Sequence, residues 1–228
     1  MERPIFKPLG TASEQLDSPS LLVDVDILDH NIATVHGFFK NQTAKLRPNV
    51  EDHRTPAIAK KQIEAGGTSG GIAVSTIGQA EIFFSNGFKN ILVLQPVIGK
   101  NKLNRLSSIS KEADITIIVD SSKNVQEISE IASENNSSIN ISVAIDCGKG
   151  LFGAANPTDV VSIIEKIQTS PSVTLQGIVG MQSDVLKSNS TELVESTKKQ
   201  LKPLLDTLEI LKDKNIEIKS VSAGNTSS

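Results

Sequence analysis

Tryptophan and tyrosine are absent from this 228-residue sequence, aromatic residues make up only 3% of it, and there is one cysteine. The shortage of aromatic rings disfavours a surface that stacks nucleotide bases. The single thiol, that of Cys147, excludes an intrachain disulfide framework and a cysteine-rich zinc site. No apolar run reaches the roughly 18 residues that would predict a transmembrane helix. Residues 1–10 lack the apolar core of a secretory signal, so we expect a cytoplasmic protein without a membrane partner.

A basic excess is also missing, because 26 acidic residues face 23 basic ones and the formal net charge is −3. Nucleic-acid binders usually carry a basic stripe, so we expect no nucleic-acid partner. The glycine fingerprint of dinucleotide-binding folds, the phosphate loop of nucleoside triphosphatases and the serine elbow of hydrolases do not occur. No spacing of His, Asp and Glu is typical of a metal site, and we expect none. We therefore expect a small-molecule ligand as the partner.

Short apolar runs that are typical of strands alternate along the chain with longer runs of helical spacing. The run from Ile115 to Val119 is continuously apolar apart from one threonine, as in buried parallel strands. Strand candidates lie at residues 21–25, 46–50, 71–75, 90–94, 114–120, 138–146, 174–180 and 217–222, and helix candidates lie at 27–40, 55–65, 77–86, 100–109, 123–134, 157–168 and 191–214.

This alternation predicts a single α/β domain over residues 1–228 with a parallel sheet. A closed (β/α)8 TIM-type barrel and a doubly wound open sheet both fit the pattern. The missing glycine fingerprint disfavours the dinucleotide-binding form of the open sheet. No helix follows the last strand candidate before Ser228, so we expect a barrel that is left open or that is part of a longer chain.

The first candidate site segment is residues 47–54, which follow the second strand candidate. In parallel α/β folds, functional side chains come from the loops after the carboxyl ends of strands. This segment combines two acids, a histidine and two arginines, so Glu51 or His53 could serve as an acid or base. The alternative is a charged helix entry whose ion pairs are solvated, since such pairs are common and weak.

Two further strand-end loops are candidates. Residues 146–150 place Lys149 between two glycines, which suits either close approach to a phosphate or carboxylate ligand or a plain turn with a solvated lysine. We expect the neighbouring Cys147 to be a buried structural thiol. Residues 222–228 are small and hydroxylated, and they could present backbone N–H groups to a phosphate or simply form a loose chain end.

Segments spread over nearly the whole chain share their residues and their order with one family. They include DSPSLLVDVD at 17–26, LRP at 46–48, QAE at 79–81, NILV at 90–93, DCGKG at 146–150, QGI at 176–178 and SAGNT at 222–226. Together they resemble the barrel domain of the fold-type III pyridoxal-phosphate (PLP) enzymes, in the branch that contains D-threonine aldolase and D-serine dehydratase. Alanine racemase is a more distant relative.

The resemblance implies a barrel that holds PLP and a separate C-terminal β-domain that this sequence does not contain. In this branch the β-domain supplies a divalent metal site. The resemblance assigns the strand candidate at 21–25 to that β-domain, within an N-terminal arm of residues 1–26. A barrel over residues 45–228 then has seven strands and lacks the eighth. An aldolase or dehydratase (lyase) acting on D-amino acids is implied, as is a homodimer.

At the implied active site the residue types differ from those of the family. The resemblance places Glu51 where the family has the lysine that forms a Schiff base with PLP, and a carboxylate cannot form that bond. It places Gln182, in Met181-Gln182-Ser183, at a family histidine. It also places Asn49 at a histidine, Ser75 and Lys149 at glutamines, and Leu151 at an arginine that supports the cofactor ring. The full set of positions implied in cofactor binding is Arg47, Asn49, His53, Ser75, Lys149, Leu151, Ser222, Gly224, Asn225 and Thr226.

Three hypotheses follow from these substitutions. The chain could be a catalytically impaired homologue that binds a small amino-acid or phosphate-bearing ligand without a covalent bond. It could be an active PLP lyase or racemase that uses a relocated lysine, Lys149. It could also be a fragment without a function of its own, because a missing strand leaves two unpaired sheet edges.

Overall fold

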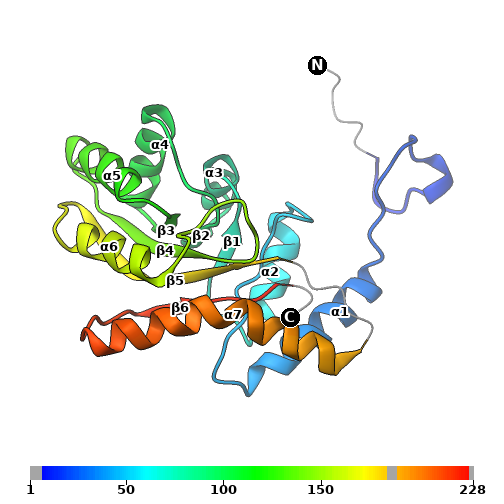
Figure 1. Cartoon of the computed structure of the whole chain (residues 1–228). Helices are drawn as coiled ribbons and strands as arrows, with labels where there is room; N and C mark the ends of the chain where they lie inside the picture. The colour runs from blue at the N-terminus through cyan, green and yellow to red at the C-terminus, as the bar shows by residue number, and fades with distance from the viewer. Residues whose placement is uncertain (1–6, 184–188, 226–228) are drawn as a thin grey trace.

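The computed structural model of this chain describes residues 7–183 and 189–225. A short 3-10 helix, η1 (Ser13–Gln15), precedes the regular elements, and residues 7–24 lie apart from the rest of the fold (Figure 1). The elements follow in the order α1 (Val25–Lys40), α2 (Pro56–Glu64), β1 (Ile72–Val74), α3 (Ile77–Ser85), β2 (Asn90–Val93), α4 (Lys100–Ser110), β3 (Asp114–Val119), α5 (Ser122–Glu134), β4 (Ile139–Cys147), α6 (Pro157–Gln168), β5 (Val173–Gln182), α7 (Ser190–Asp213) and β6 (Ser220–Ser222).

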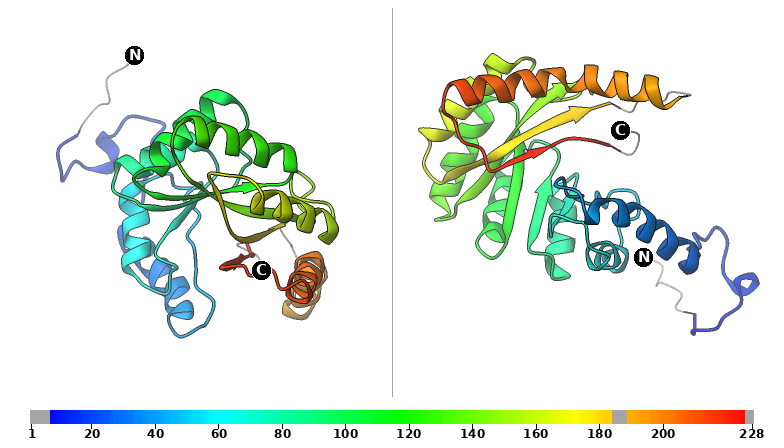
Figure 2. Two further views of the ribbon diagram at one scale, coloured as in Figure 1. Left: turned by 90° about the vertical axis from the view of Figure 1, so that its left-hand side faces the viewer. Right: turned by 90° about the horizontal axis from the view of Figure 1, so that it is seen from below.

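The described strands form one six-stranded sheet in the order β1-β2-β3-β4-β5-β6, and all neighbours pair in parallel. The sheet is curved, with the helices on its outer side, so that the chain forms part of a barrel (Figure 2). Each connection from one strand to the next passes through a helix, as parallel pairing requires. The predicted parallel α/β barrel architecture is confirmed for the described residues.

Side chains of the strands alternate between two cores. On the outer, helix-facing side, fully buried residues such as Ile72, Ile91 and Ile117 belong to the main core. On the inner, concave side, a smaller cluster consists of Ala73, Leu92, Ile118, Ala144, Val179 and Met181. This alternation follows from the two-residue period of a strand, and it determines which side chains can reach the inside of the barrel.

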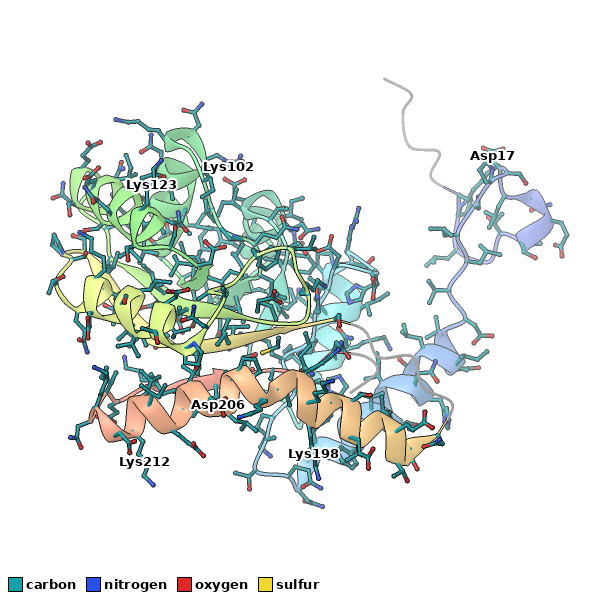
Figure 3. The ribbon with its side chains drawn as sticks, viewed as in Figure 1. Asp17, Lys102, Lys123, Lys198, Asp206 and Lys212 are labelled. Atoms are coloured by element: carbon teal, nitrogen blue, oxygen red, sulfur yellow. The ribbon has the colours of Figure 1, made fainter. Side chains whose placement is uncertain are left out.

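The outer face of α7 carries the charged residues that its helical pattern predicts. Lys198 and Lys212 are exposed on this helix, and Figure 3 shows them and Asp206 on its far side from the sheet. Leu204, Thr207 and Leu211 are buried on the opposite stripe. No helix among the described residues is long and apolar enough to cross a membrane.

The strand candidate at residues 46–50 is reduced to isolated bridges, so six regular strands are described instead of the expected seven. Leu46 bridges Thr68, and Asn49 bridges Ala73. Between them the carbonyl of Pro48 accepts a hydrogen bond from the Ala73 N–H at 2.8 Å. Proline has no N–H of its own, so a continuous ladder cannot run through this position.

The strand predicted at residues 21–25 is wrong. Residues 21–24 form no regular structure, and Leu21 is fully exposed. A strand needs a hydrogen-bonding neighbour, and none among the described residues pairs with this segment. Asp24 is instead the N-cap of α1, because its carboxylate accepts the Ile27 N–H at 3.0 Å.

Gly177 is required for the pairing of β5 with β6, which yields a test of the fold. A Cβ atom at Gly177 would overlap the backbone of Ser220, its register partner, whereas a Cβ at Gly37 in α1 would meet nothing within 4 Å. We expect Gly177→Ala to lower the free energy of unfolding by about 2 kcal/mol or more. Gly37→Ala should instead raise it by about 0.5–1 kcal/mol, because alanine favours a helix.

Urea denaturation followed by circular dichroism measures both changes as shifts of the midpoint at constant slope. Equal midpoints for the two variants would contradict the β5–β6 register described here.

Candidate functional site

The candidate site lies along the edge of the sheet where the strands end. Ser75 follows the inward-facing Ala73 by two residues, Asp120 follows Ile118, and Asp146 follows Ala144. The two-residue period therefore places these polar side chains on the concave side, at the carboxyl ends of β1, β3 and β4. Sites of parallel α/β folds are built at this edge.

Glu51 belongs to the same edge. The side chain of Val50 packs into the helix-facing core, and Glu51 follows it in a turn, just after the bridge between Asn49 and Ala73. The backbone N–H of Glu51 donates to Asn49 Oδ1 at 3.0 Å. Glu51 Oε1 lies 3.6 Å from the guanidinium of Arg54, whose side chain is 68% exposed. Glu51 Oε2 is buried and has no hydrogen-bond partner within residues 7–183 and 189–225.

His53 forms its hydrogen bonds with residues close to it in the chain and not with residues at the carboxyl edge of the sheet. Its Nδ1 accepts the Thr55 N–H at 3.0 Å, and its Nε2 lies 3.2 Å from Gln62 Oε1, to which it donates. The hydroxyl of Thr55 donates to the His53 carbonyl at 2.7 Å. Thr55 is the N-cap of α2, but its hydroxyl makes no capping hydrogen bond to the helix. His53 therefore shapes the entry to α2.

Arg47 lies at the opposite end of the sheet. Its Nη1 donates to Asn90 Oδ1 at 2.7 Å and to the Ile72 carbonyl at 3.3 Å, both at the amino ends of their strands. Burial lowers the pKa of Arg47, and the charge of Asp114 opposes this effect. The structure thus does not bring Arg47 together with Glu51. The sequence could not show that Arg47 points away from Glu51, because the end of the sheet toward which a side chain points depends on the strand register.

The loop after β4 is held by Asp146. Its Oδ1 accepts the N–H of Gly148 at 2.9 Å and that of Gly150 at 3.0 Å. Both glycines have positive φ, at 103° and 67°. Lys149 and Leu151 project from this loop into solvent, and Leu151 is 72% exposed. The loop therefore presents Lys149 at the site edge without burying it.

Cys147, at the end of β4, is buried as expected, and burial raises the pKa of its thiol. At the neighbouring loop, Gly153 has a φ of 114°, and a Cβ there would lie 2.6 Å from the Asp146 nitrogen. Its N–H donates to Asp120 Oδ2 at 3.3 Å. Only glycine fits at position 153 without strain, because the loop packs closely against the backbone of β4 there.

The ends of β5 and β6 are joined by side chains. Gln182 is 5% exposed, and its Oε1 accepts the Gly224 N–H at 2.7 Å. The Asn225 amide donates to the Ser183 carbonyl at 2.9 Å. Ser222 is the last residue of β6, and Thr226 lies outside the described residues. The structure thus brings Gln182 together with Gly224, and Ser183 together with Asn225, at the ends of β5 and β6.

Sequence reasoning missed one residue of this region, Gln200 in α7. Its Nε2 donates to Ser183 Oγ at 2.7 Å, while its Oε1 is buried and has no partner in the part of the chain that the structure describes. It lies one turn before Leu204, on the buried stripe of α7. The helical period was the signal that could have identified it, because a glutamine on a buried stripe needs hydrogen-bond partners.

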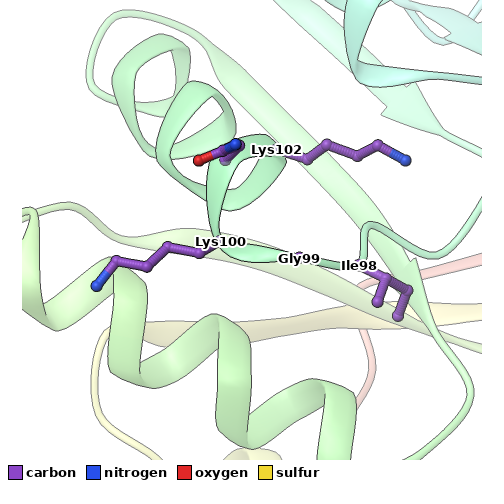
Figure 4. A pocket seen from close by; sticks show the side chains of 5 residues that line it. Ile98, Gly99, Lys100 and Lys102 are labelled. Carbon is purple, nitrogen blue, oxygen red and sulfur yellow. The ribbon is translucent and has the colours of Figure 1, made fainter.

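Hollows of the surface lie beside this edge. One of about 430 Å³ is lined by Asp120, Asp159 and Gly153, among others, where β3 ends and α6 begins. Another, of about 290 Å³, is lined by residues 98–102 at the start of α4 and contains no predicted site residue (Figure 4). Among the described residues, no group of three or more His, Cys, Asp and Glu side chains is placed to hold a metal ion.

The family model described as "Alanine racemase, N-terminal domain" matches residues 23–228. This chain belongs to that family. PLP is the cofactor of the family, and the match covers every strand and helix from α1 to β6.

Curated relatives match most of this chain. A 3-hydroxy-D-aspartate aldolase of Paracoccus denitrificans (strain Pd 1222) is 29% identical over 224 residues, which are 96% of this chain and 57% of the relative. A D-threonine aldolase of Arthrobacter sp. is 23% identical over 220 residues, covering 96% of this chain and 58% of that protein. The chain thus spans little more than half the length of these enzymes.

Solved structures share the fold. The D-threonine aldolase from Filomicrobium marinum superposes with a TM-score of 0.81 at 22% identity, over 91% of this chain and 56% of that one. The D-threo-3-hydroxyaspartate dehydratase from Delftia sp. HT23 gives 0.81 at 24% identity, over 93% of this chain and 56% of that one.

The hydrogen bonds of Asp146 make a testable prediction about the Lys149 loop. Removing the acceptor in Asp146→Ala should speed amide hydrogen exchange at Gly148 and Gly150 by about ten- to a hundred-fold, because a hydrogen bond to a charged group contributes about 1.5–3 kcal/mol. Asp146→Asn keeps an acceptor oxygen and should speed exchange less. Hydrogen–deuterium exchange with peptide-level mass spectrometry measures both, and unchanged exchange in Asp146→Ala would contradict the anchoring role.

Proposed function

We propose that this chain binds a small amino-acid or phosphate-bearing molecule without a covalent bond, at the carboxyl edge of its sheet. We further propose that it is catalytically impaired, because it cannot form the lysine–PLP bond on which its family depends. Its relatives are named as aldolases and a dehydratase of D-amino acids. We propose that the ligand is chemically similar to the amino acids in those names.

The observation that carries the proposal is the carboxylate of Glu51. Capture of the PLP aldehyde needs a primary amine, and the resemblance puts Glu51 at the position of that amine. Glu51 follows the bridge between Asn49 and Ala73, at the edge of the sheet where we propose that a ligand binds. Its Oε2 is buried without a partner among the described residues, and a carboxyl group stands where the resemblance places an amine. The residues at this position do not fit a covalently held PLP.

Substitutions at position 51 test the proposal. Each protein is incubated with PLP, reduced with borohydride and digested for mass spectrometry. We expect no lysine of the wild-type chain to be modified stoichiometrically, and we expect Glu51→Lys to gain an adduct at position 51. Glu51→Arg is the matched control, because it carries the same charge but its guanidinium stays protonated and cannot react.

A stoichiometric adduct on the wild-type chain would contradict the proposal. Circular dichroism of the three proteins checks that differences in labelling do not arise from unfolding.

One observation favours a second candidate function, an active PLP-dependent lyase or racemase that uses Lys149. The side chain of Lys149 is exposed at the same edge and forms no ion pair within residues 7–183 and 189–225. In that case the wild-type adduct would map to Lys149 and would be lost in both Lys149→Ala and Lys149→Arg. An adduct that survives these substitutions would reject this candidate.

A further inference from the structure

We propose that Asn86 is a site of spontaneous deamidation, and that the turn at the end of α3 controls how fast it reacts. Asn86 precedes Gly87, and this is the only Asn-Gly dipeptide in the sequence. Both residues are exposed, and a Cβ atom at Gly87 would meet nothing within 4 Å. Asparagine is a thermolabile residue, and a following glycine has no side chain to shield its backbone nitrogen.

The reaction needs no reagent other than water. The backbone nitrogen of Gly87 attacks Cγ of Asn86, the bond from Cγ to Nδ2 breaks, and ammonia leaves with the proton of the Gly87 N–H. Water then opens the resulting cyclic imide at either of its carbonyls. The products are aspartate and isoaspartate, and in isoaspartate the main chain runs through the former side chain.

A hydrogen-bonded turn closes the C-terminal end of α3 around this dipeptide. The Gly87 N–H donates to the Phe84 carbonyl at 3.0 Å. The Phe88 N–H donates to the Phe83 carbonyl at 3.1 Å. With Gly87 at a φ of 93°, this is the Schellman motif in which many helices end. The apolar contact typical of the motif is also present, because the rings of Phe83 and Phe88 meet edge to face with their centroids 5.3 Å apart.

The closed turn holds both reacting groups away from reaction. The nitrogen that must attack is engaged by its hydrogen bond to Phe84, and the side-chain amide of Asn86 donates to the Ile82 carbonyl at 2.8 Å. Attack on Cγ therefore requires the turn to open. Helix ends open locally at a lower free energy than the whole domain, so the rate of deamidation measures how often this turn is open.

Deamidation then prevents the turn from closing again. Isoaspartate adds a methylene group to the main chain, which shifts the N–H groups of Gly87 and Phe88 away from their acceptors. Either product adds a negative charge at the C-terminal end of α3, where the helix dipole disfavours it. The next strand starts at Asn90, whose side chain accepts the hydrogen bond from Arg47 at 2.7 Å. The modification therefore loosens the amino end of the sheet, opposite to the candidate site.

The test is incubation of the purified chain at mildly alkaline pH, followed by digestion at acidic pH and mass spectrometry. We expect the peptide that contains Asn86 to gain the mass difference between an amide and a carboxyl group. The wild-type chain unfolded in concentrated urea contains the same dipeptide without the turn, and we expect it to react faster than the folded chain. This comparison needs no variant, so it does not depend on the folding of a mutant.

Phe88→Ala removes the ring contact that closes the turn. We expect it to speed deamidation at Asn86 by about two- to tenfold, as the strength of an aromatic pair predicts. Phe38→Ala is the matched control, because it removes the same side chain from the edge-to-face pair with Phe39 at the end of α1. It should leave the rate at Asn86 unchanged. Circular dichroism checks that both variants are folded.

The other results count against the inference. An Asn86 that stays unmodified in urea would overturn it, because the dipeptide would then not react even without the turn. Equal rates in the folded and unfolded wild-type chain would overturn the control by the turn, as would equal acceleration in Phe88→Ala and Phe38→Ala. None of these results affects the proposed ligand binding at the opposite end of the sheet.

Discussion

The two-residue alternation of the parallel strands is the constraint on which the rest of the structure depends. It packs Ile72, Ile91 and Ile117 against the helices and turns Ala73, Leu92 and Ile118 to the concave side. The same alternation, within β4 and just past the ends of β1 and β3, directs Asp146, Ser75 and Asp120 to the inside. A shift of one residue in any strand would exchange these sets, so the apolar core holds the polar edge in place.

Much of this fold could be predicted from the sequence, because its signals are local. Pro157 at the first turn of α6 and Thr76 before α3 mark helix starts, and Thr76 forms a full capping box with Gln79. The prediction was wrong where a local signal for a strand was not matched by a hydrogen-bonding strand elsewhere in the chain. Residues 21–24 are rich in strand-forming side chains, yet without a neighbouring strand they stay unpaired, and Asp24 caps a helix.

The candidate site was less predictable, since its contacts join residues far apart in the chain. Gln182 and Gly224 are 42 positions apart, and nothing near either residue predicts their hydrogen bond. Arg47 could be placed in the right segment but not at the right end of the sheet, because its direction depends on the register beside β1. Glu51 is different, because its residue type alone excludes an amine at that position whatever the geometry.

Glu51 is the substituted position on which the proposed loss of covalent PLP binding rests. The described strands pair in one parallel order and Asp146 anchors the Lys149 loop, while Glu51 has a buried oxygen without a partner among the described residues. The most direct test of this account is a crystal structure of the chain soaked with PLP. The account predicts no continuous electron density between any lysine and the ligand. Continuous density from Lys149 or another lysine to the ligand would contradict it.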